Sequence, residues 1–309
     1  MKTAFVFSGQ GSQYVGMGHG VLDGHAIARE TFEEADEALG FSLSSLVREG
    51  PESELTLTEN AQPAILVYSI ALLRVLGEER PEICASVAAG HSLGEFSALV
   101  AAGSLEFADA VRLVRLRGQA MRESVAPGLG GMLAVMGLSR ETLTGLCEAT
   151  NVGSEGSTVS IAAFNSPVQS VVAGPITALE KFQESAELAG ARHCVQLKVS
   201  APFHTLALKG AGDRLREALS ICVLKTPLFP VFQNVNAVGS FEPAEIIENL
   251  VRQVSEPVQW VGCVSAMHAV GARRFVEVGP GRTLTGLIKK WDRKLEVRFT
   301  DRSAFWEQF

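Results

Sequence analysis

Residues 84–103 read CASVAAGHSLGEFSALVAAG. The first seven residues are small and apolar, which is typical of a buried strand, and the last eleven have the composition of a helix that ends at Gly103. Between them stands a G-x-S-x-G motif centred on Ser92. Gly90 and Gly94 allow the tight strand-to-helix turn on which α/β enzymes expose a nucleophile. The stretch therefore predicts an α/β fold in which Ser92 is an activated nucleophile.

The segments on either side of this turn alternate between strands and helices. Residues 4–7 (AFVF) form an apolar strand, and residues 28–39, 62–76 and 107–124 have helical periodicity, with Ser104 as the expected cap of the last helix. Strands that alternate with helices favour a mostly parallel sheet that helices cover on both faces. Two later strands and a closing helix continue the pattern at residues 227–237, 273–281 and 283–291.

A different rhythm occupies the middle of the chain. Its elements follow the order βαββαβ, which is that of a ferredoxin-like unit. They are predicted at residues 131–137, 139–150, 159–167, 170–176, 177–190 and 192–199, with Ser139 as a helix cap. We therefore expect a hydrolase-like α/β catalytic core at residues 1–127 and 200–309 and an inserted ferredoxin-like subdomain at residues 128–199.

Composition limits the class of function. The chain has 309 residues, a formal charge of −7 and 47% hydrophobic residues, which argues for a globular protein that does not bind nucleic acid. Its apolar N-terminal stretch is too short for a signal peptide or a membrane span. Five scattered cysteines predict buried, reduced thiols, and the lack of clustered ligands predicts no metal site. We expect a cytoplasmic monomer that does not bind membranes.

A serine hydroxyl needs a base, and six histidines compete for that role. Five of them lie in polar stretches, beside the serine on its turn, or at positions where packing is the simpler explanation, as for His193. His204 remains, since it follows the last strand of the predicted subdomain in a loop that can return to the main sheet. Its orienting partner is either Asp213 or an amide or backbone carbonyl, and the sequence leaves these open.

Arg117 is the residue that indicates which substrate the site accepts. Its neighbours at helical spacing are all apolar, so its guanidinium would lie in the protein interior. A buried guanidinium requires an anion, and its planar fork suits a carboxylate. One interpretation is an ion pair with an internal Asp or Glu; the other, favoured by the nearby nucleophile, is an acyl substrate with a free carboxylate.

The loop GQGSQ at residues 9–13 follows the first strand, where parallel sheets carry functional loops. Its backbone amides, together with the amide of Leu93, are candidates for oxyanion donors. Tyr14 stands where a dinucleotide-binding G-x-G-x-x-G motif requires glycine, so we expect no nucleotide cofactor.

These residues belong to a longer series of motifs that resembles the malonyl-coenzyme A:acyl carrier protein transacylases, including the acyltransferases of polyketide synthases. The series runs over almost the whole chain in the family's order. Its members are FSGQGSQ (7–13), NAQPAIL (60–66), GHSLGEFSAL (90–99), RLRGQAM (115–121), SAPFH (200–204), QNVNA (233–237), RQVSEPVQW (252–260) and EVGPGRTLTGL (277–287).

The resemblance implies a role for each matching position. Ser92 would be the acylated nucleophile, His204 its base and Arg117 the ligand of the malonyl carboxylate. Further roles implied by the resemblance are oxyanion donation by the amides of Gln10 and Leu93, orientation of His204 by a carbonyl of Gln253, and a substrate pocket lined by Gln62, Met121 and Phe203. The bulk of Phe203 resembles the pattern that selects malonyl over methylmalonyl groups. Ser8 replaces the proline that the family commonly carries, which removes a fixed φ from the oxyanion loop.

The implied activity is that of an S-malonyltransferase in fatty acid or polyketide synthesis. Its substrates would be malonyl-CoA and an acyl carrier protein, with no separate cofactor. A carrier protein is typically acidic, so Lys289, Lys290 and Arg293 are candidates for its contact surface, or else an ordinary solvated helix face. Two alternatives are a hydrolase of acyl carrier protein thioesters, which would have less use for Arg117, and a docking module without catalysis, which would not need Ser92.

Overall fold

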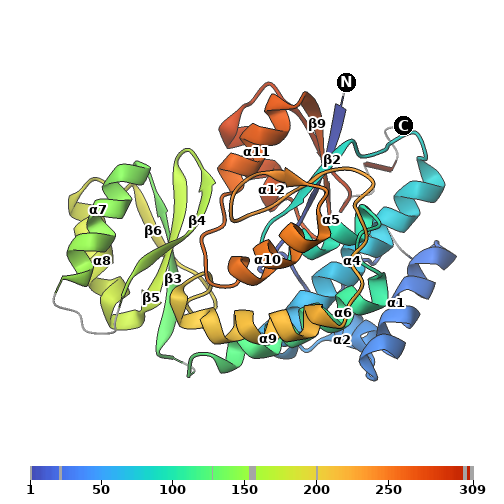
Figure 1. Cartoon of the computed structure of the whole chain (residues 1–309), viewed down its shortest axis with the longest axis horizontal. Coiled ribbons are helices and arrows are strands. Elements are labelled where there is room, and N and C mark those ends of the chain that lie inside the picture. Colours follow the sequence, from blue (N-terminus) through green and yellow to red (C-terminus); the bar gives the residue numbers. More distant parts are fainter. Residues whose placement is uncertain are drawn as a thin grey trace.

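Two sheets organise the chain in the computed structural model, which describes residues 2–20, 23–126, 128–152, 158–199, 201–301 and 305–306 (Figure 1). Among these residues, the larger sheet has the strand order β10-β9-β1-β2-β7-β8. Every neighbouring pair is parallel except β7 and β8, which confirms the predicted α/β class. The strands are β1 (Lys2–Phe7), β2 (Val87–Gly90), β7 (Val231–Phe232), β8 (Gly239–Ser240), β9 (Ala272–Val278) and β10 (Glu296–Phe299).

Helices pack on this sheet because their apolar faces need cover. The buried helix α4 contacts β9, and the short helix α5 contacts β1. Helix α11 contacts β2, β7 and β9. The helices of the core are α1 (Ala26–Leu39), α2 (Leu43–Glu49), α3 (Glu52–Leu55), α4 (Thr58–Glu79), α5 (Gly94–Ala101), α6 (Phe107–Glu123), α9 (Lys209–Ser220), α10 (Pro243–Gln253), α11 (Trp260–Ala269) and α12 (Thr283–Trp291), with a 3-10 turn at Leu206–Leu208.

Helix α4 is long and apolar enough to cross a membrane by length and composition alone. However, 83% of its apolar window is buried inside the molecule. It packs against α6 and α1, as a core helix does. Its apolar residues are thus accounted for by contacts within the fold.

The second sheet is antiparallel and has the order β4-β5-β3-β6. Its elements follow one another as βαββαβ, which confirms the predicted ferredoxin-like unit; they are β3 (Gly130–Met136), α7 (Arg140–Asn151), β4 (Ser160–Ser166), β5 (Gln169–Pro175), α8 (Ile176–Leu188) and β6 (His193–Gln196). Phe182 lies at the centre of a separate apolar cluster between the sheet and its two helices. The predicted domain boundaries fall at residues 127 and 200, which lie outside the described residues.

Strand β4 joins the small sheet to the core. Val258, which precedes α11, forms a parallel bridge with Ala163, with bonds of 2.9 Å from Phe164 N to Val258 O and from Val258 N to Ala162 O. Nearby, Nε2 of His91 lies 2.8 Å from Oδ1 of Asn165 on β4. The small sheet is therefore attached directly beside the turn that carries Ser92.

Several local predictions were wrong. Ser104 does not cap α6, because its hydroxyl donates to the carbonyl of Lys225 at 2.6 Å and the helix begins after Glu106. His193 is exposed on β6 rather than packed, because β6 is an edge strand of the small sheet. Helix α12 does not close the fold, since β10 follows it as an edge strand. Cys84 is exposed and Cys194 and Cys222 are partly buried, so only Cys147 and Cys263 are the buried thiols that the sequence predicts. The predicted cap Ser139 is confirmed, because its hydroxyl accepts a bond from the backbone amide of Thr142.

The separate cluster around Phe182 makes a stability prediction. Phe182→Ala removes a fully buried ring from the small subdomain and should lower the free energy of unfolding by about 3–5 kcal/mol. Leu188→Ala, at a position of the same helix that is 91% exposed, should change it by less than about 0.5 kcal/mol. Urea denaturation followed by circular dichroism measures both, and equal midpoint shifts would contradict the assignment.

Candidate active site

The nucleophile turn joins β2 to α5. Ser92 has a positive φ of 51°, and the backbone amide of Ser92 donates to Oδ1 of Asn234 at 2.7 Å. A side chain at Gly90 would place its Cβ 1.8 Å from the carbonyl carbon of Gly94, and one at Gly94 would lie 2.2 Å from the carbonyl oxygen of Phe7. Glycine is therefore required at both positions, because the turn packs against its own helix and against β1.

Arg117 lies in the interior beside this turn. It extends from α6 and is only 1% exposed. Its guanidinium donates to Oε1 of Gln62 at 2.8 Å, to Oε1 of Gln253 at 3.0 Å and to Oγ of Ser92 at 3.0 Å. All three acceptors are neutral. Within the described part of the chain no carboxylate lies within 4 Å of it, so the alternative of a direct internal ion pair does not hold there.

Burial lowers the pKa of Arg117 to about 10, so the guanidinium is still protonated at neutral pH. Its Nε has no hydrogen-bond partner among the described residues. A buried cation surrounded by neutral acceptors can still accept an anionic ligand, because no protein carboxylate has to be displaced first. The arrangement can thus hold a carboxylate next to the serine hydroxyl.

His204 is buried with a positive φ of 60°. Its Nδ1 donates to the backbone carbonyl of Gln253 at 2.7 Å, which leaves Nε2 unprotonated in the neutral ring. Burial, and then the charge of Arg117, lower the pKa of His204 to about 3, so the ring is a neutral base at pH 7. Of the two orienting partners that the sequence left open, the backbone carbonyl of Gln253 holds this imidazole. Asp213 lies exposed on α9.

Gln253 connects these groups. It is fully buried at the end of α10. Its backbone carbonyl binds His204, its side-chain oxygen accepts from Arg117, and its amide nitrogen donates to the backbone oxygen of Ser92 at 3.1 Å. One side chain and its own carbonyl therefore set the positions of three groups that come from α6, the 201–205 loop and the nucleophile turn.

Two backbone amides that the sequence predicts as oxyanion donors have no hydrogen-bond acceptor in the described part of the chain. Within the described residues, neither the amide of Gln10 nor that of Leu93 donates a hydrogen bond. The side chain of Gln10 is held by Thr58 at 3.1 Å. Ser8 does not leave this loop loose, because it is buried and its hydroxyl donates to Glu277 at 3.3 Å.

The remaining predicted substrate residues are buried as well. Gln62 donates from its amide nitrogen to Sδ of Met121 at 3.5 Å while its oxygen binds Arg117, so its orientation is determined from both sides. Phe203 is 5% exposed and directly precedes His204. The sequence-predicted residues at positions 62, 92, 117, 121 and 253 thus form one continuous set of contacts.

The comparison with protein families agrees with this geometry. The family model described as "Acyl transferase domain" matches residues 4–297. This chain belongs to the acyl transferase family.

Relatives of this acyl transferase are similar over nearly their full length. The malonyl CoA-acyl carrier protein transacylase of Bacillus subtilis is 44% identical over 296 residues, which cover 96% of this chain and 92% of the relative. The protein of the same name from Escherichia coli K12 is 44% identical over 93% of this chain and 92% of its own length.

Solved structures show the same fold. An acyl carrier protein S-malonyltransferase from Vibrio cholerae has a TM-score of 0.95 at 40% identity, covering 100% of this chain and 99% of the other. A malonyl-transacylase solved in complex with a type II PKS acyl-carrier protein has a TM-score of 0.96 at 39% identity, covering 100% and 98%. The expected fold and family are thereby confirmed.

Sequence reasoning assigned no role to two residues of this site. Asn234 holds the turn, because its amide nitrogen donates to Gly90 O at 2.7 Å while its oxygen accepts from the amide of Ser92. Glu95, three residues after Ser92, is a fully buried carboxylate. Both lie inside motifs noted in the sequence, QNVNA and GHSLGE, but only the fold brings these motifs together.

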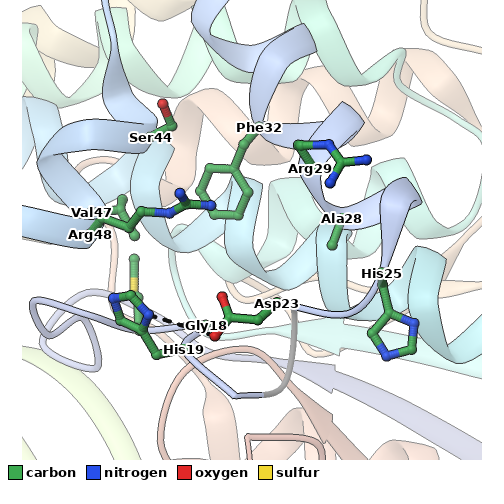
Figure 2. A pocket seen from close by; sticks show the side chains of 11 residues that line it. Gly18, His19, Asp23, His25, Ala28, Arg29, Phe32, Ser44, Val47 and Arg48 are labelled. Carbon is green, nitrogen blue, oxygen red and sulfur yellow. Dashed lines mark ion pairs between the residues drawn. The ribbon is translucent and has the colours of Figure 1, made fainter.

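A separate pocket of about 290 Å³ lies where the loop after β1 meets α1 and α2 (Figure 2). His19, His25, Arg29 and Arg48 surround an apolar floor that includes Phe32. Nδ1 of His19 lies 3.8 Å from Oδ2 of Asp23, which also lines the pocket. None of the residues that hold Ser92, Arg117 or His204 lines it, so it plays no part in the site described above.

The buried imidazole makes stability depend on pH. The unfolded chain protonates His204 near pH 6.5 but the folded chain only near pH 3, so this contribution to stability is lost as the pH falls below 6.5. Between pH 7.5 and 5.5 the wild type should lose roughly 1 kcal/mol more than His204→Asn, since asparagine tolerates the positive φ and does not titrate. Urea denaturation at both pH values measures this, with exposed His193→Asn as the control that should follow the wild type.

Proposed function

We propose that this acyl transferase moves a malonyl group from malonyl-CoA, through an ester on Ser92, to the phosphopantetheine thiol of an acyl carrier protein. The observation that carries the proposal is the buried guanidinium of Arg117, which lies 3.0 Å from Oγ of Ser92 and contacts only neutral acceptors. An acyl group whose far end is a carboxylate would satisfy the cation while its thioester reaches the hydroxyl. The names of the relatives support the same reaction.

In the first step Oγ of Ser92 attacks the thioester carbonyl and Nε2 of His204 takes its proton. The oxygen of the tetrahedral intermediate would accept from the amides of Gln10 and Leu93, which have no other acceptor in the described structure. The carbon–sulfur bond then breaks, and the proton passes from His204 to the sulfur of coenzyme A. The products are malonyl-Ser92 and the free thiol.

The second step reverses the roles. The carrier protein's thiol gives its proton to His204 and attacks the ester carbonyl, and the proton returns to Oγ of Ser92 as the carbon–oxygen bond breaks. All of these groups belong to the chain or to its two substrates, so we propose that no separate cofactor takes part. A malonyl group held by Arg117 would also keep the ester oriented for a thiol rather than for water.

Phe203 and Met121 are the proposed boundary of the acyl pocket. Both are buried, and Met121 contacts the glutamine that holds Arg117. Phe203 directly precedes the proposed base, and the family resemblance implies that an α-methyl branch would compete with its ring for space. We therefore propose malonyl over methylmalonyl as the preferred group.

The decisive experiment uses labelled malonyl-CoA with and without carrier protein. Transfer predicts stable label on Ser92 that moves to the carrier when it is added, and no label on Ser92→Ala. Hydrolysis would instead release free malonate without the carrier, and a docking module would take up no label. Either of the latter two results contradicts the proposal.

Arg117→Ala should change the choice of donor. Loss of a buried, charge-assisted contact costs about 3 kcal/mol, so the ratio of kcat/KM for malonyl-CoA to that for acetyl-CoA should fall about 100-fold. Steady-state transfer assays with both donors measure this ratio. Arg115→Ala is the control on the same helix, because Arg115 binds Glu59 O and Asn60 instead of the site. An unchanged ratio in Arg117→Ala would remove the assignment of a carboxylate ligand.

We further propose that the carrier protein contacts the C-terminal half of α12. A groove of about 630 Å³ is lined there by Lys289, Lys290 and Arg293 together with Val168 of the small subdomain. Lys290 spans the two parts of the groove through a bond of 3.1 Å to Gln169. Positive charge at a groove shared by both subdomains suits an acidic partner.

Reversing two of these charges should affect the second substrate alone. In Lys290→Glu/Arg293→Glu the KM for carrier protein should rise at least about tenfold at low salt, with less effect at high salt, because interfacial charge acts mainly on association. The rate of Ser92 labelling by malonyl-CoA is measured alongside. Lys181→Glu, at an exposed position of α8, is the control. Equal effects of both variants would argue against the groove.

We propose a cytoplasmic monomer without membrane or nucleic acid partners, in fatty acid or polyketide synthesis. The net charge of −7 supports the absence of nucleic acid binding. Sedimentation velocity over a range of concentrations would test the oligomeric state directly.

A further inference from the structure

Glu95 is a buried carboxylate that the reaction described above does not use. It lies in the first turn of α5, three residues after Ser92, and is 0% exposed. Its Oε2 accepts hydrogen bonds from the backbone N–H of Asn234 and from Nε2 of Gln253, each at 2.8 Å. Its Oε1 accepts from Nε2 of Gln233 at 3.3 Å. A buried carboxylate is costly even with such donors, so its presence here calls for a physical reason.

One consequence of Glu95 is the orientation of Gln253. Nε2 of this side chain has three acceptors, Glu95 Oε2 at 2.8 Å, Ser92 O at 3.1 Å and Asn234 Oδ1 at 3.4 Å. The amide therefore turns its oxygen towards Arg117, where it accepts from Nη2. With the amide reversed, its nitrogen would face the guanidinium as a second donor. Glu95 thus ensures that Gln253 presents its side-chain oxygen, and not its nitrogen, to Arg117.

The second consequence is electrostatic. Arg117 has no carboxylate within ion-pair distance among the described residues, and Glu95 is separated from it by the one amide of Gln253. The charge of Glu95 raises the pKa of Arg117, and the charge of Arg117 lowers that of Glu95. The pair therefore interacts across Gln253 without direct contact, which leaves the guanidinium open to another anion.

We propose that Glu95 is the internal counter-charge of Arg117, and that it takes up a proton when the carboxylate of an acyl group binds the guanidinium. This inference rests on the proposed malonyl transfer and adds a linked proton to it. When Glu95 is ionised and no acyl group is bound, one buried cation balances one buried anion. A bound malonyl carboxylate would add a second anion, and protonation of Glu95 restores the balance.

The proton affinity of the group fits this role. Burial raises the pKa of Glu95 to about 7, against the opposing effects of its hydrogen bonds and of Arg117. Both forms are thus populated near neutral pH. Cys263 and Arg117 are the other titratable groups that interact with Glu95, and both stay in one form in this range, since burial raises the pKa of the Cys263 thiol and the pKa of Arg117 is about 10. The nearby base His204, which Gln253 holds, has a pKa of about 3 and stays neutral.

The sign of the pH dependence follows. A second anion raises the pKa of Glu95, so loading takes up protons and becomes weaker as the pH rises above about 7, by up to tenfold per pH unit for one proton. Acetyl groups carry no carboxylate and should show no such dependence. The difference between the pH dependence of malonyl loading and that of acetyl loading therefore measures the proton that Glu95 takes up.

The test measures protons and label together. The enzyme is mixed with malonyl-CoA in weak buffer containing a pH indicator, and labelled Ser92 is counted in the same samples. Acyl transfer itself is neutral, because the serine proton leaves on the thiol of coenzyme A; acetyl-CoA corrects for ionisation of that thiol. We expect net proton uptake with malonyl-CoA and none with acetyl-CoA, and the uptake per malonyl group should be larger at pH 8 than at pH 7.

Glu95→Gln is the matched variant, since its side-chain oxygen can still accept from Asn234 and Gln253 while it carries no titratable charge. It should be labelled by malonyl-CoA without proton uptake, and its KM for malonyl-CoA should not vary with pH between 6.5 and 8. Two results would overturn the proposal. One is that Glu95→Gln takes up as many protons as the wild type; the other is that the wild type is labelled by malonyl-CoA without taking up protons. Absence of labelling in the wild type would instead overturn the malonyl transfer itself.

A measurement on the wild type alone guards against a variant that does not fold. With either donor, infrared difference spectra of the loaded minus the free enzyme contain the C=O band of the acyl-serine ester. With malonyl-CoA at pH 8 they should also contain the C=O band of a protonated carboxyl group, which shifts in D₂O whereas the ester band does not. Loading with acetyl-CoA should not produce this carboxyl band. A malonyl-loaded enzyme without that band would contradict protonation of Glu95.

Discussion

The structure depends on one unfavourable arrangement, a guanidinium held in the interior beside a serine hydroxyl. Transfer of an isolated charge from water to the interior is costly, and Arg117 offsets that cost with neutral acceptors and with a carboxylate one amide away. A direct ion pair would have been a simpler solution. It would also have blocked the position that an incoming carboxylate needs, so the indirect arrangement keeps the cation available.

This constraint explains why so many elements converge on Gln253. Its backbone carbonyl holds His204, and its side chain lies between Arg117, Glu95 and Ser92. A glutamine can serve donors and acceptors at once, which an acidic residue at the same place could not do without adding charge next to the guanidinium. The hydrogen bond to the Gln253 carbonyl raises the pKa of His204, but burial and the charge of Arg117 lower it by more, so the base stays neutral.

Backbone strain is concentrated at the same place. Ser92 and His204 both have positive φ, a conformation that costs a non-glycine residue roughly 1 kcal/mol or more. The surroundings impose it through Asn234 on one side and the Gln253 carbonyl on the other. The small sheet is attached through β4 next to His91, so its position follows that of the nucleophile turn.

The sequence alone determined the alternation of strands and helices, the βαββαβ order of residues 130–196 and the nucleophile turn, because each depends on local spacing and on glycine. It also placed Arg117 on an apolar helix face. It did not reveal that β10 follows α12, that Ser104 binds Lys225, or that Glu95 meets Arg117 through Gln253. These contacts join segments more than 100 residues apart, or form at sheet edges where periodicity is weak. Only the packing of the chain decides which buried polar groups share one interior.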